Sequence, residues 1–218
     1  RTSERVEVPA SNQKSSASAI FKSIFTNKAL LGIIVAAIFV LLSQLTVLSL
    51  AGYVYPNVYG SAAAQSTASL LGTVVMLVVC APFASKLSAK FGKKELAMGS
   101  SIFSALVWLV CLIWRPASVW GFVACYILAN IGMGFFNTII WAMITDVIDD
   151  AEVRNGVRED GTIYSVYSFA RKLGQAFSSG LVGALLGIIG YTEATAFDPV
   201  VTRGIFNLAC TAPIIGFV

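Results

Sequence analysis

The sequence contains no histidine among its 218 residues. Without an imidazole, this chain cannot form a Ser-His-Asp triad, a Cys-His dyad or a histidine-ligated metal site. An enzyme would need a nucleophile beside some other base. The only cations deep in an apolar stretch are Arg171 and Lys172, so we expect this chain not to be an enzyme and to hold no metal or organic cofactor.

Charged side chains are scarce as well, at 12% of the residues, whereas 57% are hydrophobic. A soluble domain has about 25% charged residues. A domain of this length also exposes too much surface to hide so many apolar side chains. A disordered chain is excluded because it needs low hydrophobicity and high net charge. The net charge of +4 is too small and dispersed to suggest nucleic acid, so an integral membrane protein remains.

Cysteine is rare and scattered, with no two residues in a CxxC arrangement. We expect all four thiols to behave as small buried apolar side chains. They are Cys80, Cys111, Cys125 and Cys210.

Long apolar runs are what the sequence has in abundance. A helix needs about 20 mostly apolar residues to cross the hydrocarbon core, and five runs are that long. The expected spans are about 30–54, 62–84, 97–114, 119–145 and 163–189. A sixth run begins near Gly204 and stops at Val218, where about 15 residues would rise only about 22 Å. We therefore expect a polar segment, 1–28, followed by a six-helix bundle, 29–218, whose last helix is truncated.

Lysine and arginine alternate between the two sides of this bundle. The N-terminal segment has five of them, and the following loops have none, four, one, two and one. Cytoplasmic loops carry the excess of these residues. The sequence therefore predicts that residues 1–28 form a cytoplasmic loop segment, and that both ends of a completed bundle face the cytoplasm.

Four acids stand at the end of the fourth expected span, where they oppose the helix dipole. Asp146 and Asp149 are three residues apart and share a helix face. Two interpretations stay open: a solvated charged loop, or a cytoplasmic latch that forms in one conformation and breaks in another. The acids are Asp146, Asp149, Asp150 and Glu152, and the local cations that could pair with them are Arg154 and Arg158.

Lys172 lies 11 residues past Gly161, about 16 Å along a helix and so near the middle of the bilayer. An intramembrane cation costs about 3 kcal/mol even on insertion scales, and it normally faces a bundle interior or an aqueous cavity beside a partner. Snorkelling to the headgroups is the alternative, and it suits Arg171 better than Lys172. No acid lies at matching depth in the other spans, so Lys172 would need a partner from elsewhere.

Three expected helices carry polar stripes at helical spacing. Amide and hydroxyl groups can bind a polyol, and Trp141 or Tyr167 could stack on a sugar ring. The equally weighted alternative is polar contact between helices, and the glycines around Gly183 and Gly187 suggest close helix packing. The stripes are Tyr164, Ser168, Lys172, Gln175 and Ser179; Asn130, Gly134, Asn137 and Trp141; and Gln44 with Ser43 and Thr46.

At these residues the sequence resembles the glycoside-pentoside-hexuronide:cation symporters, a branch of the major facilitator superfamily. The resemblance covers essentially the whole chain. It rests on Asp146-x-x-Asp149, on Gly156-x-Arg158-Glu159-Asp160-Gly161, on Tyr164-Ser165-x-Tyr167-Ser168-Phe169-x-x-Lys172-Leu173-Gly174-Gln175, on Thr2-x-Glu4-Arg5-Val6 and on Phe91-Gly92-Lys93-Lys94.

The resemblance implies an all-α membrane protein whose six helices form the C-terminal half of a twelve-helix carrier in a bacterial inner membrane. Its partners would be the lipid bilayer, an N-terminal six-helix half and a sugar or glycoside bound between the halves. Lys172 matches the family's intramembrane lysine, and Tyr167 and Ser168 match sugar-facing positions. The cytoplasmic gate would comprise Asp146, Asp149 and Arg158, with Glu152 beside them.

Two departures from the family pattern stand out. Asp150 replaces a frequent tyrosine, and the acids that coordinate the coupling cation, Na⁺ or H⁺, lie mainly in the first half. The leading hypothesis is a cation-coupled sugar symporter that works by alternating access. The alternatives are a carrier of lipids or other amphiphiles with the same fold and a non-transporting membrane scaffold.

Overall fold

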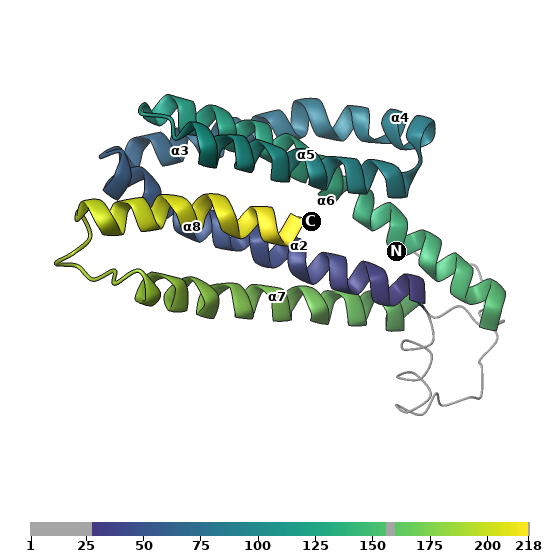
Figure 1. Ribbon diagram of the computed structural model, residues 1–218. Coiled ribbons are helices and arrows are strands. Elements are labelled where there is room, and N and C mark those ends of the chain that lie inside the picture. The colour runs from purple at the N-terminus through teal and green to yellow at the C-terminus, as the bar shows by residue number, and fades with distance from the viewer. Residues whose placement is uncertain (1–27, 156–159, 218) are drawn as a thin grey trace, which may run out of the picture.

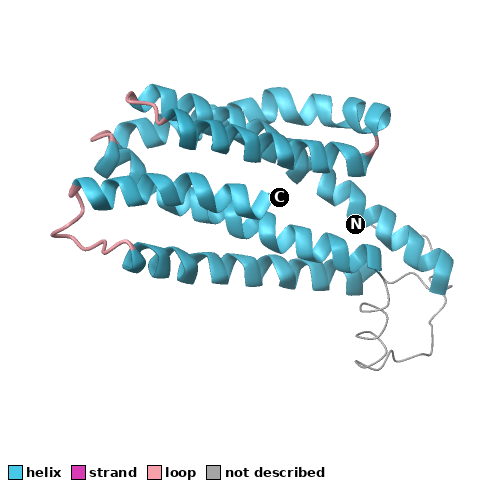
Figure 2. Cartoon of the chain, viewed as in Figure 1, coloured by secondary structure: helices cyan, strands magenta, loops and turns pink. Residues whose placement is uncertain are grey.

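The computed structural model describes residues 28–155 and 160–217, and every element in these ranges is a helix (Figure 2). The helices form six rods joined by short turns. The rods are α2 (Lys28–Tyr53) continued by the π segment η1 (Val54–Val58); α3 (Ala62–Val75), η2 (Met76–Cys80) and α4 (Ala81–Phe91) in line; α5 (Lys93–Trp114); α6 (Val119–Asn155); α7 (Asp160–Ile188); and α8 (Pro199–Phe217). The all-α, six-helix prediction is confirmed. The loop segment expected at 1–28 lies, except for its last residue, outside the described residues.

Five of the rods are long and apolar enough to cross a membrane, namely Leu31–Val58, Ala62–Phe91, Lys93–Trp114, Val119–Asp150 and Pro199–Phe217 in the described part of the chain. The exception is α7, although it was expected to span. Its polar stripe and its adjacent cations, Arg171 and Lys172, make it less apolar than the other rods.

The apolar runs locate the rods but make two of them too short. α6 continues ten residues past Thr145, so Asp146 and Asp149 lie within a helix and not in a loop. A helix can outlast the apolar run because its backbone bonds do not depend on side-chain hydropathy. α8 begins at Pro199, not near Gly204, and its 19 residues rise about 28 Å. Proline is favoured at a first helical position because its missing N–H would be unpaired there.

A π segment accompanies proline in each of the first two rods. Pro56 lies within η1, and Pro82 follows η2 by two residues. Proline has no N–H to offer the carbonyl four residues earlier. For Pro82 that carbonyl belongs to Val78, inside η2, so the local shift to wider π hydrogen bonding coincides with the missing donor.

The rods lie roughly parallel in two groups (Figure 1). One group contains α2, α7 and α8, with α2 packed against both of the others, and the second contains α3, α4, α5 and α6. Contacts of α8 with α5 and of α2 with α6 join the groups. The turn between α4 and α5, which contains Gly92, and the N-terminus of α2 lie at the same end of the bundle (Figure 1).

Glycines set the closest helix contacts, but not the glycines that the sequence suggested. A Cβ added at Gly132 would overlap the Ser104 hydroxyl and the Ser100 carbonyl of α5, and one at Gly216 would overlap the Ser43 side chain of α2. Gly183 and Gly187 have open space around them in the described structure. The expected packing role of this GxxxG pair is therefore wrong within this bundle.

An aromatic cluster fills the core at the end of the bundle away from Gly92. Phe122 packs against Tyr55 edge to face at 5.4 Å and against Trp108 and Phe206 at 5.9 Å. Tyr59 Oη donates to the Pro116 carbonyl at 2.9 Å. The four cysteines are buried and unpaired, which confirms the expectation for them.

These contacts predict different responses at two helical glycines. Gly132→Ala should destabilise the protein by about 1–3 kcal/mol, because the new methyl group meets a backbone carbonyl that cannot easily move. The matched control, Gly183→Ala, should be neutral or slightly stabilising because alanine is the better helix former. Thermal unfolding in detergent measures both. Equal stability of the two variants would contradict the tight α5–α6 contact.

Candidate functional site

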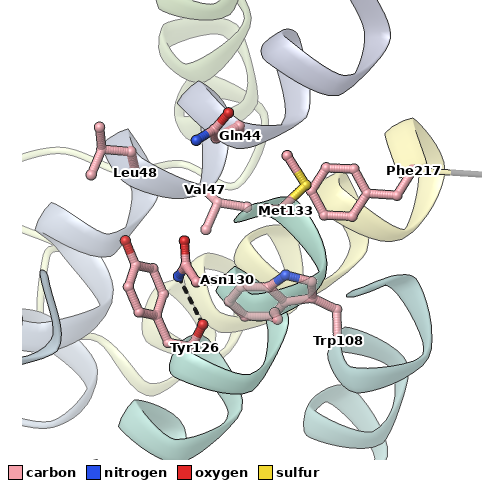
Figure 3. Close-up of a pocket in the computed structure, with 9 residues that line it drawn as sticks. Gln44, Val47, Leu48, Trp108, Tyr126, Asn130, Met133 and Phe217 are labelled. Atoms are coloured by element: carbon pink, nitrogen blue, oxygen red, sulfur yellow. Dashed lines mark hydrogen bonds between the residues drawn. The ribbon is translucent and has the colours of Figure 1, made fainter. Parts of the chain in front are cut away.

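A small cavity lies inside the bundle between α2, α5, α6 and α8 (Figure 3). Its volume is about 70 Å³, well below the roughly 300 Å³ of the smallest typical ligand pockets but sufficient for a few water molecules. Gln44 and Asn130 reach it from different helices, and Asn130 Nδ2 donates to the Tyr126 carbonyl at 2.8 Å. The lining consists of Gln44, Val47, Leu48, Trp108, Tyr126, Ala129, Asn130, Met133 and Phe217.

The predicted polar stripe of α6 extends away from this cavity along the helix. Asn137 Nδ2 donates to Gln44 Oε1 of α2 at 3.4 Å, so the two amides join the helices next to the cavity. Trp141 lies one turn further on and is 43% exposed. From Asn130 to Trp141 the stripe rises about 16 Å. It is a line of hydrogen-bonding groups that ends at an accessible indole.

Trp141 belongs to a cluster with three side chains of α7, here called the Trp141 cluster. Its ring meets Tyr167 edge to face at 5.3 Å and lies nearly parallel to Tyr164 at 6.4 Å. The Arg171 guanidinium lies over Trp141 at 5.2 Å and over Tyr167 at 5.8 Å. Such cation–π contacts hold a cation in place without neutralising it. The snorkelling suggested for Arg171 does not describe this arrangement.

α7 separates its side chains into two faces. The face packed on the bundle consists of Ile163, Tyr167, Ala170, Gly174, Ser178, Val182 and Leu186. The predicted polar stripe lies on the other side, with Ser168, Lys172 and Ser179 exposed and Tyr164 and Gln175 half-buried. Tyr167 is only 2% exposed. It therefore supports Trp141 from behind, and Trp141 is the ring that a sugar could reach.

Lys172 is exposed on α7, and among the described residues it forms no ion pair or hydrogen bond. The six-helix bundle therefore supplies no counter-charge to it within residues 28–155 and 160–217. That its partner comes from elsewhere stays a prediction.

Asp146 has a partner that the sequence analysis did not assign to it. Lys93 Nζ, at the start of α5, lies 2.6 and 2.7 Å from the two carboxylate oxygens of Asp146 on α6. It also lies 3.4 Å from the Ala142 carbonyl. From the sequence, Lys93 was named only as part of the motif Phe91-Gly92-Lys93-Lys94, whereas the structure makes it one half of an ion pair between helices.

The remaining gate residues are placed less completely. Asp149 is exposed and Glu152 half-buried, both on α6. Arg158 lies outside the described residues.

The turn that presents Lys93 depends on Gly92, whose φ of +94° is readily adopted only by glycine.

Two signals could have revealed the missed partners. Arg171 follows Tyr167 by four residues, which places it directly above that ring on a helix. Lys93 and Asp146 lie at the ends of successive spans that meet on one side of the membrane. Helix spacing therefore suffices for the first contact, but the second also needs knowledge of which rods are neighbours.

Comparisons with known proteins agree on the class of protein. The family described as MFS/sugar transport protein matches residues 1–218. The chain is 34% identical over 189 residues to Uncharacterized symporter YjmB of Bacillus subtilis (strain 168), covering 84% of this chain and 39% of that protein. It is 28% identical over 190 residues to the Glucuronide carrier protein homolog of Escherichia coli (strain K12), covering 86% and 41%. The chain thus spans less than half the length of these relatives.

The Lys93–Asp146 pair should contribute little to stability, because the Lys93 side chain is 38% exposed to solvent and the Asp146 side chain 55%. A double-mutant cycle with Lys93→Gln and Asp146→Asn should give a coupling free energy of at most about 1 kcal/mol, reduced further by about 1 M salt. Thermal unfolding measures it, with the neighbouring exposed Lys94→Gln as the control. A coupling of several kcal/mol would show that the pair is a structural support and not a readily broken latch.

Proposed function

Because this chain belongs to the MFS/sugar transport protein family, we propose that it is one six-helix half of a carrier that moves a sugar or glycoside across a membrane together with Na⁺ or H⁺. The resemblance to glycoside-pentoside-hexuronide:cation symporters is confirmed by the family match and the similar transporters. The chain is a multi-pass membrane protein. The bacterial inner membrane and cytoplasmic ends belong to the proposal.

The observation that carries this proposal is the polar stripe of α6. Asn130, Asn137 and Trp141 line one side of a helix in an otherwise apolar bundle, and Gln44 adds a second amide from α2. Amides beside an aromatic ring suit a ligand with many hydroxyls on an apolar ring. The cavity at Asn130 is too small for such a ligand, so we assign the sugar to the Trp141 end of the stripe, facing a second half.

Alternating access requires contacts that form and break with only a small change in free energy. Lys93 and Asp146 suit this role, since they join two helices at one end of the bundle and remain in contact with solvent. We propose that this pair and the neighbouring acids close the cytoplasmic side while the sugar is reached from the other side. Rocking of two halves about a fixed central site is the general scheme for such carriers.

Lys172 is the residue to which we assign coupling. Its ammonium is unpaired within the described bundle, and a cation inside the membrane needs a counter-charge. We propose that carboxylates of the N-terminal half pair with it. Binding of Na⁺ or H⁺ to those carboxylates rearranges the pairing and raises the affinity for sugar, and this coupling is reciprocal.

Replacing Lys172 tests coupling directly. In the carrier that combines this chain with its N-terminal half, Lys172→Ala should abolish accumulation of glycoside against its gradient, because cation binding no longer alters the sugar site. Uptake of radiolabelled glycoside into cells, with and without a cation gradient, measures this. Arg203→Ala removes an exposed cation of α8 and is the matched control. Normal accumulation by Lys172→Ala would refute the coupling role.

A second uptake experiment tests the class of cargo. A carrier of amphiphiles would take up a labelled lysolipid, whereas the polar stripe predicts uptake of glycoside. Trp141→Ala should lower glycoside uptake roughly 2- to 10-fold, since stacking on an aromatic ring contributes about 0.5–1.5 kcal/mol. Lysolipid uptake in preference to glycoside would overturn the sugar assignment, and no flux of either would favour the scaffold alternative.

A further inference from the structure

The Arg171 side chain carries a charge that the described bundle does not neutralise. Among residues 28–155 and 160–217, no carboxylate pairs with Arg171, whose polar contact there is with the Tyr167 side chain. Asp146, the first acid after Trp141 on α6, is held by Lys93 at 2.6 Å. Lys172 adds a second unpaired cation next in the chain. Two adjacent cations of α7 therefore have no carboxylate partner in the described bundle.

The same guanidinium is nevertheless held in a defined position. It lies over Trp141 and Tyr167 at 5.2 and 5.8 Å, and Tyr167 is itself fixed in the core. Stacking on aromatic rings uses the face of a guanidinium and leaves its N–H donors available, and those donors match a carboxylate or a similar oxyanion two at a time. An arginine that is fixed by stacking in this way can bind an anion through its N–H donors.

The surroundings narrow down which anion it is. Trp141 is 43% exposed beside the guanidinium, so a ligand can contact the indole and the charge together. The stripe of Asn137 and Gln44 continues from there with amides suited to hydroxyl groups. A small inorganic anion would use only the charge, whereas a sugar that bears an acidic group would use all three features.

We propose that Arg171 determines specificity for an acidic sugar, by binding a carboxylate or sulfonate of the substrate while Trp141 contacts its ring. This rests on the proposed function and deepens it, since it names the charge of the substrate and the residue that selects it. Arg171 recognises the anionic group, and Lys172, about 100° further round α7, keeps its separate role in coupling.

Two substrates that differ only at C6 test the proposal. p-Nitrophenyl β-D-glucuronide has a carboxylate there, and p-nitrophenyl β-D-glucoside has a hydroxymethyl group. In the two-half carrier, Arg171→Gln should raise KM for the glucuronide roughly 10- to 100-fold, the range for losing a hydrogen bond to a charged group. KM for the glucoside should change less than about threefold. Arg171→Lys should fall between, because it keeps the charge and loses the two-point geometry.

Controls separate this proposal from its competitors. Arg203→Gln removes one positive charge elsewhere and should leave the preference intact. Glucoside uptake by Arg171→Gln shows that the variant is folded. A proportional loss for both substrates would make Arg171 structural and overturn the proposal, although sugar transport would stand. If the wild-type carrier moved neither these nor other glycosides, the proposed function and this inference would both fail.

An anionic lipid headgroup offers the same chemistry as an acidic sugar. Proteoliposomes prepared with and without phosphatidylglycerol distinguish the two sources. If Arg171 holds a lipid, uptake of both substrates will depend on phosphatidylglycerol in the wild type but not in Arg171→Gln, and this result would overturn the proposal. A glucuronide preference that is the same in both lipid compositions, and that is lost in Arg171→Gln, supports it.

Discussion

The high free energy of an unpaired polar group in hydrocarbon governs the arrangement of this molecule. Hydrocarbon offers no hydrogen-bond partner, so polar side chains in spanning helices must meet other protein groups or water. The amides of Gln44 and Asn137 meet each other, and Asn130 meets the Tyr126 carbonyl beside a cavity. Lys172 meets no polar protein group in the described bundle. The polar face of α7 therefore marks the side on which something other than lipid is required.

The rods were predictable because their apolar runs are long, but their ends and their contacts were not. α6 continues through a run of acids that no hydropathy argument includes, and α8 begins at a proline before its apolar run. Glycine spacing was misleading because a GxxxG pattern cannot show which face of a helix meets a neighbour. Gly132, in an unremarkable sequence context, forms the close contact, and Gly183 faces open space.

The candidate site divides in the same way between local and distant information. Contacts within four residues on one helix, such as Arg171 with Tyr167, follow from helical spacing alone. The stripe of α6 was recognised for the same reason. Lys93 and Asp146 are 53 positions apart, and their pairing depends on how α5 packs against α6. For Asp146, nearness in sequence pointed to Arg154 and Arg158, whereas its partner Lys93 comes from another helix.

The π segment η2 has a consequence for how the second rod tolerates insertions and deletions. A π turn accommodates one more residue than an α turn, so α4 is rotated by about 100° relative to an uninterrupted continuation of α3. α3 packs against α6 near Gly72, and α4 packs against its own neighbours. The helix faces that make these two contacts are thus offset by about 100° from where one continuous α-helix would place them. Losing one residue from Met76–Cys80 would restore a regular helix and leave both faces directed as they are now, whereas losing one residue elsewhere in the rod would turn them apart by about 100°. The interval Met76–Cys80 is therefore the place where the second rod can lose one residue without losing its contacts.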